Sequence, residues 1–197
     1  MDYAYKISES IKADVGILEY EVPRGSVGVS VVNSARLVVP VGEQMDSLYG
    51  FFKMYHTRCE SVKCDVELHK EFCTVSFTLV DEHYESPYDI EVRGNVSGVS
   101  PWDLVPVSGA FKYAPVAEEG VYRLRIPRQV DASLEMVMLS NQEIVSRFPL
   151  GEYIIRSGYD WSATDLSDVS VALDLEKQQV MVTVSGWDEI VVMDVVI

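Results

Sequence analysis

Short runs of alternating apolar and polar residues recur along almost the whole chain, and they constrain its fold more than any other feature of the sequence. Each run spans roughly six to nine residues, and turn-forming residues separate one run from the next. No run alternates with a long helical pattern, so a parallel α/β sheet is not expected. The sequence therefore predicts an all-β fold, an antiparallel β-sandwich.

The clearest alternation lies in residues 148–187. This segment predicts a strand, a turn at Gly158–Trp161, one helical turn and a β-hairpin, in that order. The helical turn is expected over residues 162–168, where Ser162 and Asp165 have the spacing of N-cap residues. In the hairpin, the positions expected to face the core are Val169, Val171, Leu173, Leu175, Val180, Val182 and Val184.

A change of phase marks the middle of the chain. Between Val62 and Leu68 the apolar residues occupy even positions, whereas Cys73, Val75, Phe77 and Leu79 occupy odd ones. Shifting the phase by one residue sends side chains to the opposite face of a sheet. We therefore expect a β-bulge or a crossing between two sheets near residues 69–71.

The net charge of −15 excludes several kinds of partner. Nucleic-acid binding requires a concentration of Lys and Arg, and adsorption to anionic lipid requires the same. A hydrophobic content of 48% is too high for a disordered chain. The apolar runs are far shorter than the ~20 residues that span a bilayer. The first residues lack the features of a secretory signal, so we expect a cytosolic protein or one whose signal lies outside this sequence.

Cysteine spacing gives no metal site. The three cysteines are Cys59, Cys64 and Cys73, and their spacing does not match the paired cysteines of structural zinc sites. Buried, unreacted thiols are the favoured interpretation, and a disulfide between Cys59 and Cys64 is the alternative. We expect no metal and no cofactor.

The sequence also contains no recognisable catalytic motif. Its histidines form no metalloprotease motif, and no nucleophile motif is present. The acidic pairs at residues 81–82, 118–119 and 188–189 could form a glycosidase site, but each lies in an expected turn. We therefore predict a non-enzymatic protein with no catalytic residues.

Four aromatic residues leave a second function open. Trp102, Tyr159, Trp161 and Trp187 could form a stacking platform for sugars if they were exposed together. Tyr159 and Trp161 are two residues apart, so they share a face in an extended segment. The favoured interpretation is a buried structural corner, and the alternative is a carbohydrate-binding β-sandwich module of a surface or secreted protein.

Several segments together carry a family resemblance. They are Pro40–Gln44, Asp46–Gly50, Leu68–Val75, Tyr88–Asn95, Pro127–Gln129 and Gly158–Trp161. In order and spacing they resemble the FimB-type minor fimbrillins, the fimbrial anchor subunits of Bacteroidales, over residues 15–187. The resemblance implies transthyretin-like β-sandwiches and a structural subunit that anchors fimbriae in cell adhesion. It also implies a lipoprotein of the cell outer membrane.

The domain division follows from the same resemblance. We expect a shortened N-terminal β domain at residues 1–57 and a transthyretin-like β-sandwich at residues 58–197. A domain of fifty-odd residues would be marginal alone, so it is expected to pack on the second domain. Family members carry a lipidated cysteine after a signal, and no cysteine precedes Cys59 here. We therefore expect this chain to lack the lipid anchor.

The last residues form the candidate partner-binding segment. They are apolar and mostly β-branched, and an unpaired strand of this kind is prone to aggregate. We expect a final strand that is buried on both faces of its own sandwich, or one that is donated to another fimbrial subunit or to a second copy. The partner-binding residues would be Ile190, Val191, Val192, Met193, Val195, Val196 and Ile197.

Overall fold

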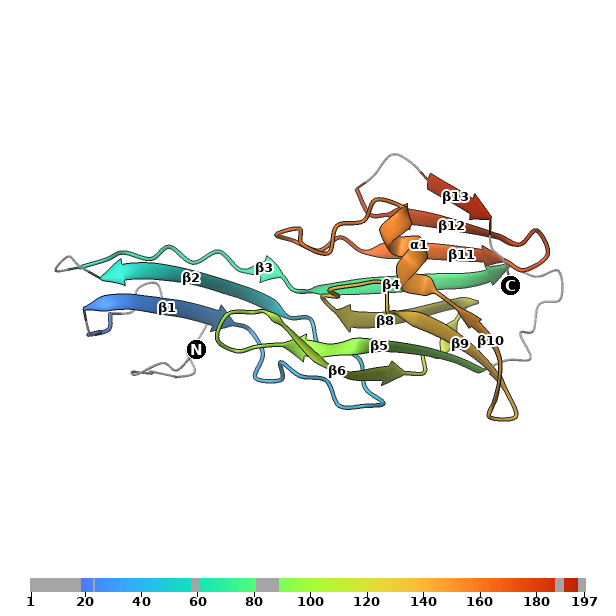
Figure 1. Ribbon diagram of the computed structural model, residues 1–197, viewed down its shortest axis with the longest axis horizontal. Coiled ribbons are helices and arrows are strands. Elements are labelled where there is room, and N and C mark those ends of the chain that lie inside the picture. The colour runs from blue at the N-terminus through green and yellow to red at the C-terminus, as the bar shows by residue number, and fades with distance from the viewer. Residues whose placement is uncertain (1–18, 23, 58–60, 81–88, 187–189, 195–197) are drawn as a thin grey trace.

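The computed structural model describes residues 19–22, 24–57, 61–80, 89–186 and 190–194. A long two-stranded ribbon extends from one end of a broader β-sandwich (Figure 1). None of the helices in the described part is long and apolar enough to cross a membrane. The elements in chain order are β1 (Gly25–Val32), β2 (Tyr49–Thr57), β3 (His69–Lys70), β4 (Phe72–Val80), β5 (Asp89–Val99), β6 (Pro106–Tyr113), β7 (Ala117–Glu118), β8 (Val121–Pro127), β9 (Glu135–Ser140), β10 (Glu143–Phe148), α1 (Leu150–Arg156), β11 (Val169–Asp174), β12 (Gln179–Val184) and β13 (Ile190–Asp194).

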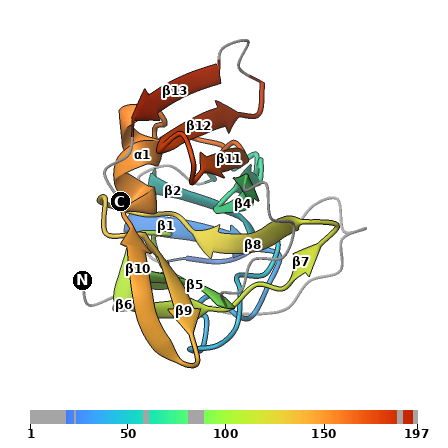
Figure 2. The same ribbon diagram turned by 90° about the vertical axis from the view of Figure 1, so that its right-hand side faces the viewer.

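The strands form three sheets, which confirms the predicted all-β sandwich. A four-stranded sheet has the order β10-β9-β5-β6, and a six-stranded sheet has the order β13-β12-β11-β4-β8-β7. Figure 2 shows these two sheets as separate layers, with α1 along one side. The third sheet, β1-β2-β3, forms the ribbon. Every pairing is antiparallel except the one between β4 and β11.

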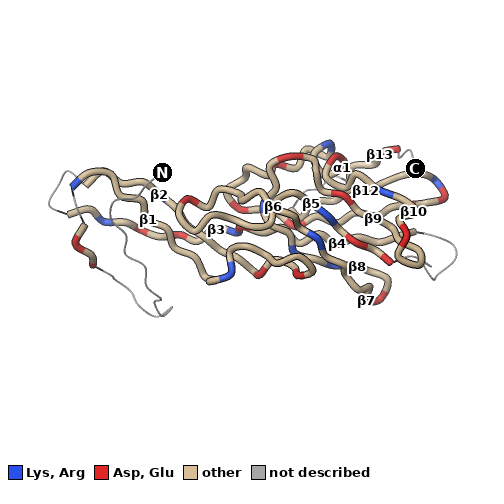
Figure 3. Tube along the Cα trace, turned by 60° about the horizontal axis from the view of Figure 1, so that its bottom comes forward, with Lys and Arg blue, Asp and Glu red and all other residues tan. Residues whose placement is uncertain are grey.

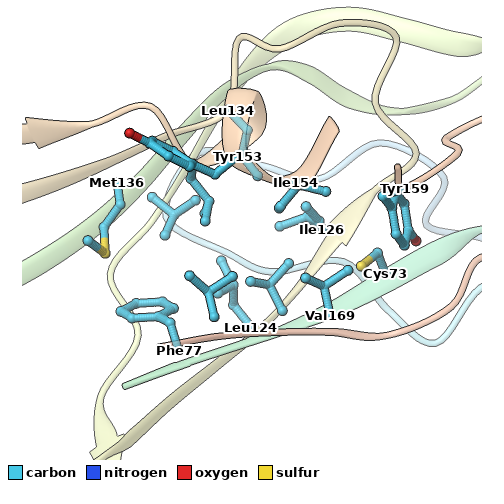
Figure 4. Close-up of a cluster of buried hydrophobic side chains, with 14 of the residues drawn as sticks. Cys73, Phe77, Leu124, Ile126, Leu134, Met136, Tyr153, Ile154, Tyr159 and Val169 are labelled. Carbon is cyan, nitrogen blue, oxygen red and sulfur yellow. The ribbon is translucent and has the colours of Figure 1, made fainter. Parts of the chain in front are cut away.

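One hydrophobic core fills the space between the two larger sheets (Figure 4). On β4 the side chains of Cys73, Val75 and Phe77 are buried, and Leu79 packs against the core, as the sequence predicts. The predicted inward positions of β11 and β12 are also confirmed, because Val169, Val171, Leu173, Val180, Val182 and Val184 are all buried. Leu150 and Ile154 of α1 contribute to the same core.

The predicted change of phase coincides with a crossing between sheets. β3 pairs with β2 in the ribbon, whereas β4, which begins two residues after Lys70, lies in the six-stranded sheet. The segment before this crossing differs from the prediction. Residues 61–68 form no strand, and Val62, Val66 and Leu68 are exposed. Apolar and polar residues do alternate in this segment, but no described element covers the apolar side chains.

Residues 37–48 belong to the sandwich although they precede it in the chain. β5 pairs with β9 over its first half, and over its second half Val39 donates to the carbonyl of Ser97 at 2.7 Å. Gly98 permits this contact, because a Cβ there would lie 2.0 Å from the carbonyl oxygen of Leu37. Met45 and Leu48 are fully buried in the core. The N-terminal region thus packs on the sandwich, while the boundary at residue 57 stays a prediction.

The segment after β10 corrects two sequence-based predictions. Residues 150–156 form the helix α1 where a strand was expected. The spacing of Leu150, Tyr153 and Ile154 places all three on one helical face, and all three are buried. The helical turn expected over residues 162–168 is absent, since this part of the described chain consists of a turn, bends and irregular structure. Asp160 there accepts hydrogen bonds from both the backbone and the hydroxyl of Ser162, at 2.8 and 2.6 Å.

Candidate functional site

The C-terminal candidate segment is an edge strand of the six-stranded sheet. β13 pairs with β12 in antiparallel register, from Thr183 opposite Ile190 to Gln179 opposite Asp194. The hydroxyl of Tyr153 on α1 donates to the carbonyl of Asp194 at 3.2 Å. β13 therefore occupies a position in its own sandwich. Val195, Val196 and Ile197 lie outside the described residues.

The expectation that this strand is buried on both faces is wrong. Burial alternates along β13, since Ile190 and Val192 are 61% and 54% exposed while Val191 and Met193 are half-buried. Met193 alone of these residues packs against the core. No other described strand pairs with the outer edge of β13. The strand is held by pairing with β12 and by the hydrogen bond from Tyr153. It is less buried than its neighbour β12.

The β1–β2 ribbon has a second apolar surface that is only partly covered. Residues opposite each other in an antiparallel pair share a face, and the register places Val27 opposite Tyr55 and Val31 opposite Phe51. With Val29 these residues form a largely apolar face, and every one of them is half-buried rather than buried. The same face also carries the exposed Lys53, which lies opposite Val29. We call this surface the ribbon face.

The outer edge of β1 carries backbone groups that point away from β2. The N–H of Asn33 donates to the carbonyl of Tyr49 on β2 at 3.1 Å, so odd-numbered residues of β1 direct their backbone groups toward β2. Backbone direction alternates along a strand, and the groups of Gly28 and Ser30 therefore point outward. β1 ends its sheet, and no strand in the described ranges pairs with this edge.

Tyr159 and Trp161, two of the four aromatic candidates, do not belong to an exposed platform. Tyr159 and Trp161 are buried and pack edge to face with ring centroids 4.6 Å apart. The Tyr159 hydroxyl donates to the carbonyl of Ser167 at 2.6 Å, which confirms the structural corner. Trp102 is partly exposed in the loop after β5, and Trp187 lies outside the described residues. The sugar-stacking hypothesis therefore fails for Tyr159 and Trp161.

Arg128 fixes this aromatic corner to the rest of the fold. Its Nε donates to the Glu71 carboxylate at 2.9 Å, and the side chains of both residues are almost fully buried. Its Nη1 donates to the carbonyls of Trp161 and Ala163 at 2.5 and 2.7 Å. Glu71 is the residue at which the chain crosses from β3 to β4. Arg128 thus joins the ribbon, the sandwich and the corner.

Two aspartates of the same turn hold the start of β4. Asp165 accepts from the backbone of Lys70 at 2.7 Å and lies 3.0 Å from His69 Nδ1, and these hydrogen bonds lower the pKa of Asp165. Burial raises the pKa of Asp168, but hydrogen bonds from Lys70 Nζ and the Thr74 backbone outweigh it, so that this pKa lies below its ordinary value. Asp165, expected to cap a helix, connects the turn to β3 instead, and Asp168 connects it to β3 and β4.

The ionisable groups of the described residues do not converge on a catalytic arrangement. His56 contacts Ser26 Oγ at 3.0 Å and His69 contacts Asp165, both within structural pairs. Glu118 and Glu119 lie in the β7–β8 hairpin, and the acidic pairs at 81–82 and 188–189 lie outside the described residues. No group of three metal-binding side chains occurs among the described residues. Acidic positions are spread over the whole trace rather than gathered at one place (Figure 3).

One hollow in the surface was not foreseen from the sequence. It has a volume of about 370 Å³ and lies where β7 and β8 approach β4 and the end of β6. Its polar lining includes Gln44, Thr74 and Arg123, which are far apart in the sequence and adjacent in the fold. We call it the β8 hollow. No sequence motif marks it, because only the strand order assembles it.

Comparisons with known proteins give a fold but no family. No protein-family model matches the sequence, and no curated protein matches it. Among solved structures, a proposed adhesin from Bacteroides ovatus gives a TM-score of 0.54 at 14% sequence identity, and the alignment covers 87% of this chain and 76% of that one.

Two proteins from Bacteroides thetaiotaomicron are also similar. A proposed polysaccharide-binding protein gives a TM-score of 0.56 at 13% identity, covering 79% of this chain and 62% of that one. A proposed adhesin gives a TM-score of 0.51 at 13% identity, covering 86% and 78%. At such low identities the shared property is the fold. This chain therefore has the multi-sheet β-sandwich fold of these Bacteroides proteins.

Proposed function

We propose that this chain is a non-enzymatic, cell-surface adhesion subunit of the fimbrial-anchor type, which meets neighbouring subunits by pairing strands. Two findings support the proposal. The fold is shared with proposed adhesins over most of the chain. The segments between residues 15 and 187 resemble those of fimbrial anchor subunits in sequence order and spacing. Location at the outer membrane, transthyretin-like domains and the division at residue 57 are parts of the same proposal.

The observation that carries this proposal is the ribbon. Its largely apolar ribbon face is half-buried, and no strand of the described residues pairs with the outward backbone groups of β1. Exposed strand edges of this kind accept an additional strand, which supplies backbone hydrogen bonds and covers apolar side chains. The ribbon is therefore assigned as the surface that receives a strand.

The C-terminal segment is assigned as the strand that is donated to the partner. β13 is bound through one neighbour and alternates exposed with half-buried apolar residues. This pattern fits an edge strand that directs one row of its side chains into a partly apolar face of the partner. The residues assigned to the contact are Ile190, Val191, Val192, Met193, Val195, Val196 and Ile197, and the partner is another fimbrial subunit or a second copy of the chain.

A proline at the outward edge of β1 tests the receiving surface. The probe is a fluorescent peptide with the sequence of residues 188–197, added to the full-length chain, in which β13 already occupies the edge of β12. Ser30→Pro removes an outward N–H, and proline is compatible with an edge strand. We expect the peptide to bind the unaltered chain and the Ser30→Pro variant to bind it at least tenfold more weakly.

Ser30→Ala is the matched control. The Ser30 hydroxyl donates to the carbonyl of Pro101 at 2.8 Å, so the alanine variant removes this hydrogen bond and keeps the backbone N–H. It should bind the peptide like the unaltered chain. If Ser30→Pro binds equally well, or if the unaltered chain does not bind, β1 is not the receiving edge. A chain lacking residues 190–197 should stay folded, and its failure to fold would contradict the donor role.

A further inference from the structure

The β8 hollow lies beside an interruption in the edge of the six-stranded sheet. β7 pairs with β8 only through Ala117 with Tyr122 and Glu118 with Val121. Glu119 and Gly120, both with positive φ, form the tight turn between them. Pairing therefore stops immediately before Arg123. Figure 2 shows β7 and β8 projecting on the side of the molecule away from α1.

Residues 44–45 cover the same edge of β8, but only at Arg125 and not at Arg123. The backbone N–H of Arg125 donates to Gln44 Oε1 at 3.0 Å, and its carbonyl accepts from the Met45 N–H at 3.0 Å. Arg125 thus directs its backbone away from β4. Because this direction repeats every second residue, the N–H and carbonyl of Arg123 point the same way, into the gap between β7 and residue 44.

The guanidinium of Arg123 is the distinctive side chain of the hollow. Arg125 donates to Met45 and Ser47, and Arg128 has four acceptors nearby. Arg123 is exposed and has no hydrogen bond or ion pair to any of the described residues. A planar guanidinium with free donors binds a carboxylate through two parallel hydrogen bonds. The hollow therefore offers one strong anion-binding group.

The remaining lining suits a hydroxylated ring rather than a plain anion. Gln44, Thr74 and Glu118 supply amide, hydroxyl and carboxylate groups that exchange hydrogen bonds with hydroxyls. Tyr113 and Val121 supply apolar surface for the C–H face of a ring. A volume of about 370 Å³ lies within the range of small-ligand sites.

We infer that the β8 hollow binds a carboxylate-bearing sugar, a uronic-acid residue of a glycan, with its carboxylate on Arg123. The net charge of −15 repels polyanions in general, so recognition depends on direct contact with this one guanidinium. The site does not require the strand contacts proposed above. It also differs from the aromatic platform considered from the sequence, since it contains none of those four residues.

Calorimetric titration of the full chain with trigalacturonate tests the inference. We expect saturable binding of the acidic trisaccharide and at least tenfold weaker binding of the neutral galactose trimer. Arg123→Gln should weaken binding of trigalacturonate at least tenfold, and Arg123→Lys should weaken it less. Arg123 is exposed on the surface, so both variants should fold, which circular dichroism checks.

Arg147→Gln is the matched control for charge. Arg147 is an exposed arginine on β10, where it pairs with Glu135 at 2.6 Å, so this variant changes the net charge equally and leaves the hollow intact. Its affinity for trigalacturonate should be unchanged. Equal binding of the neutral trimer, or binding unaffected by Arg123→Gln, would overturn the inference. Preferential binding of triglutamate would assign the hollow to acidic peptides instead and would also overturn it.

Discussion

The ribbon and the sandwich start from the same sequence pattern and reach different degrees of burial. Val27, Val29 and Val31 on β1 alternate in the same way as Val180 and Val182 on β12. The β12 residues are buried, whereas the β1 residues are only half-buried. The difference is that the helix α1 packs against β12, while the ribbon is two strands wide over most of its length (Figure 1). Alternation thus specifies a face, and the topology decides whether anything covers it.

This comparison assigns different tasks to the two regions. The sandwich supplies stability through a continuous core, and the ribbon carries apolar surface that a partner can cover. A two-stranded ribbon is marginal by itself, and here it is attached to the sandwich through the 37–48 segment and the β3–β4 crossing. Measurements that separate core from ribbon therefore test the comparison directly.

The largest expected effect is the loss of a core side chain from β4. Replacing Phe77, which is buried and stacks on Tyr122 with ring centroids 4.9 Å apart, by alanine should cost about 3–5 kcal/mol of unfolding free energy. Phe51→Ala in the half-buried ribbon should cost less than half as much. Denaturant unfolding measures both. Equal losses would show that the ribbon is as tightly packed as the sandwich.

A somewhat smaller loss is expected when the link between the regions is broken. Arg128→Met leaves Glu71 buried without its cation and leaves the carbonyls of Trp161 and Ala163 without their donor. Removing one partner of a buried ion pair costs about 3 kcal/mol or more. The exposed pair of Arg147 with Glu135 supplies the control, because Arg147→Met should change stability by about 0–1 kcal/mol. Similar effects for both variants would argue against a special role for Arg128.

Acid should weaken the sandwich before it affects the ribbon strands. β1 and β2 contain no carboxylate, whereas Glu91 on β5 is nearly buried between Arg93 and Lys112. Burial raises the pKa of Glu91, but the bonds from Lys112 and Arg93 outweigh it and the pKa is lowered. The stabilisation by Glu91 is therefore present above its unfolded pKa, near 4.3, and is lost as the pH falls toward the lower folded pKa.

Unfolding measured between pH 7 and pH 3 checks this expectation. Glu91→Gln should flatten the loss of stability below about pH 4.3, because glutamine does not titrate in this range. An identical pH profile for the variant and the unaltered chain would remove Glu91 from the explanation.

The smallest effect concerns thiol reactivity rather than stability. Burial raises the pKa of the Cys73 thiol on β4 to about 12, so it should resist alkylation at neutral pH until the chain unfolds. Cys64, in the extended segment 61–68, is half-buried and free, and it should react in the native state. Mass spectrometry after brief iodoacetamide treatment distinguishes the two. Rapid native labelling of Cys73 would show that the core opens easily.

The sequence was sufficient to predict the structure in the strands where the alternating apolar residues are also the buried ones. The inward faces of β4, β11 and β12 and the sheet crossing at Glu71 followed from residue phase alone. The helix α1 could not be predicted in this way, because Ile154 and Ile155 favour strands locally. The helix forms because it buries Leu150, Tyr153 and Ile154.

The candidate surfaces were harder to predict. The C-terminal segment was recognised as a strand from its composition, but its one-sided exposure depends on the strand order. The β8 hollow combines Gln44, Thr74 and Arg123, and no local pattern reports that three distant segments meet. Similarly, the exposure of Val62 and Val66 reflects the lack of a covering element in the described structure rather than their own pattern.

The parallel pair of β4 with β11 has a consequence for biogenesis. The backbone of Thr74 at the start of β4 bonds to Asp168, which is 94 residues later in the chain. At a synthesis rate of about 5–20 residues per second, β4 waits on the order of 5–20 seconds before this neighbour exists. Its other neighbour, β8, is made earlier. The six-stranded sheet can therefore be completed only after most of the polypeptide has been synthesised, with one edge of β4 unpaired until then.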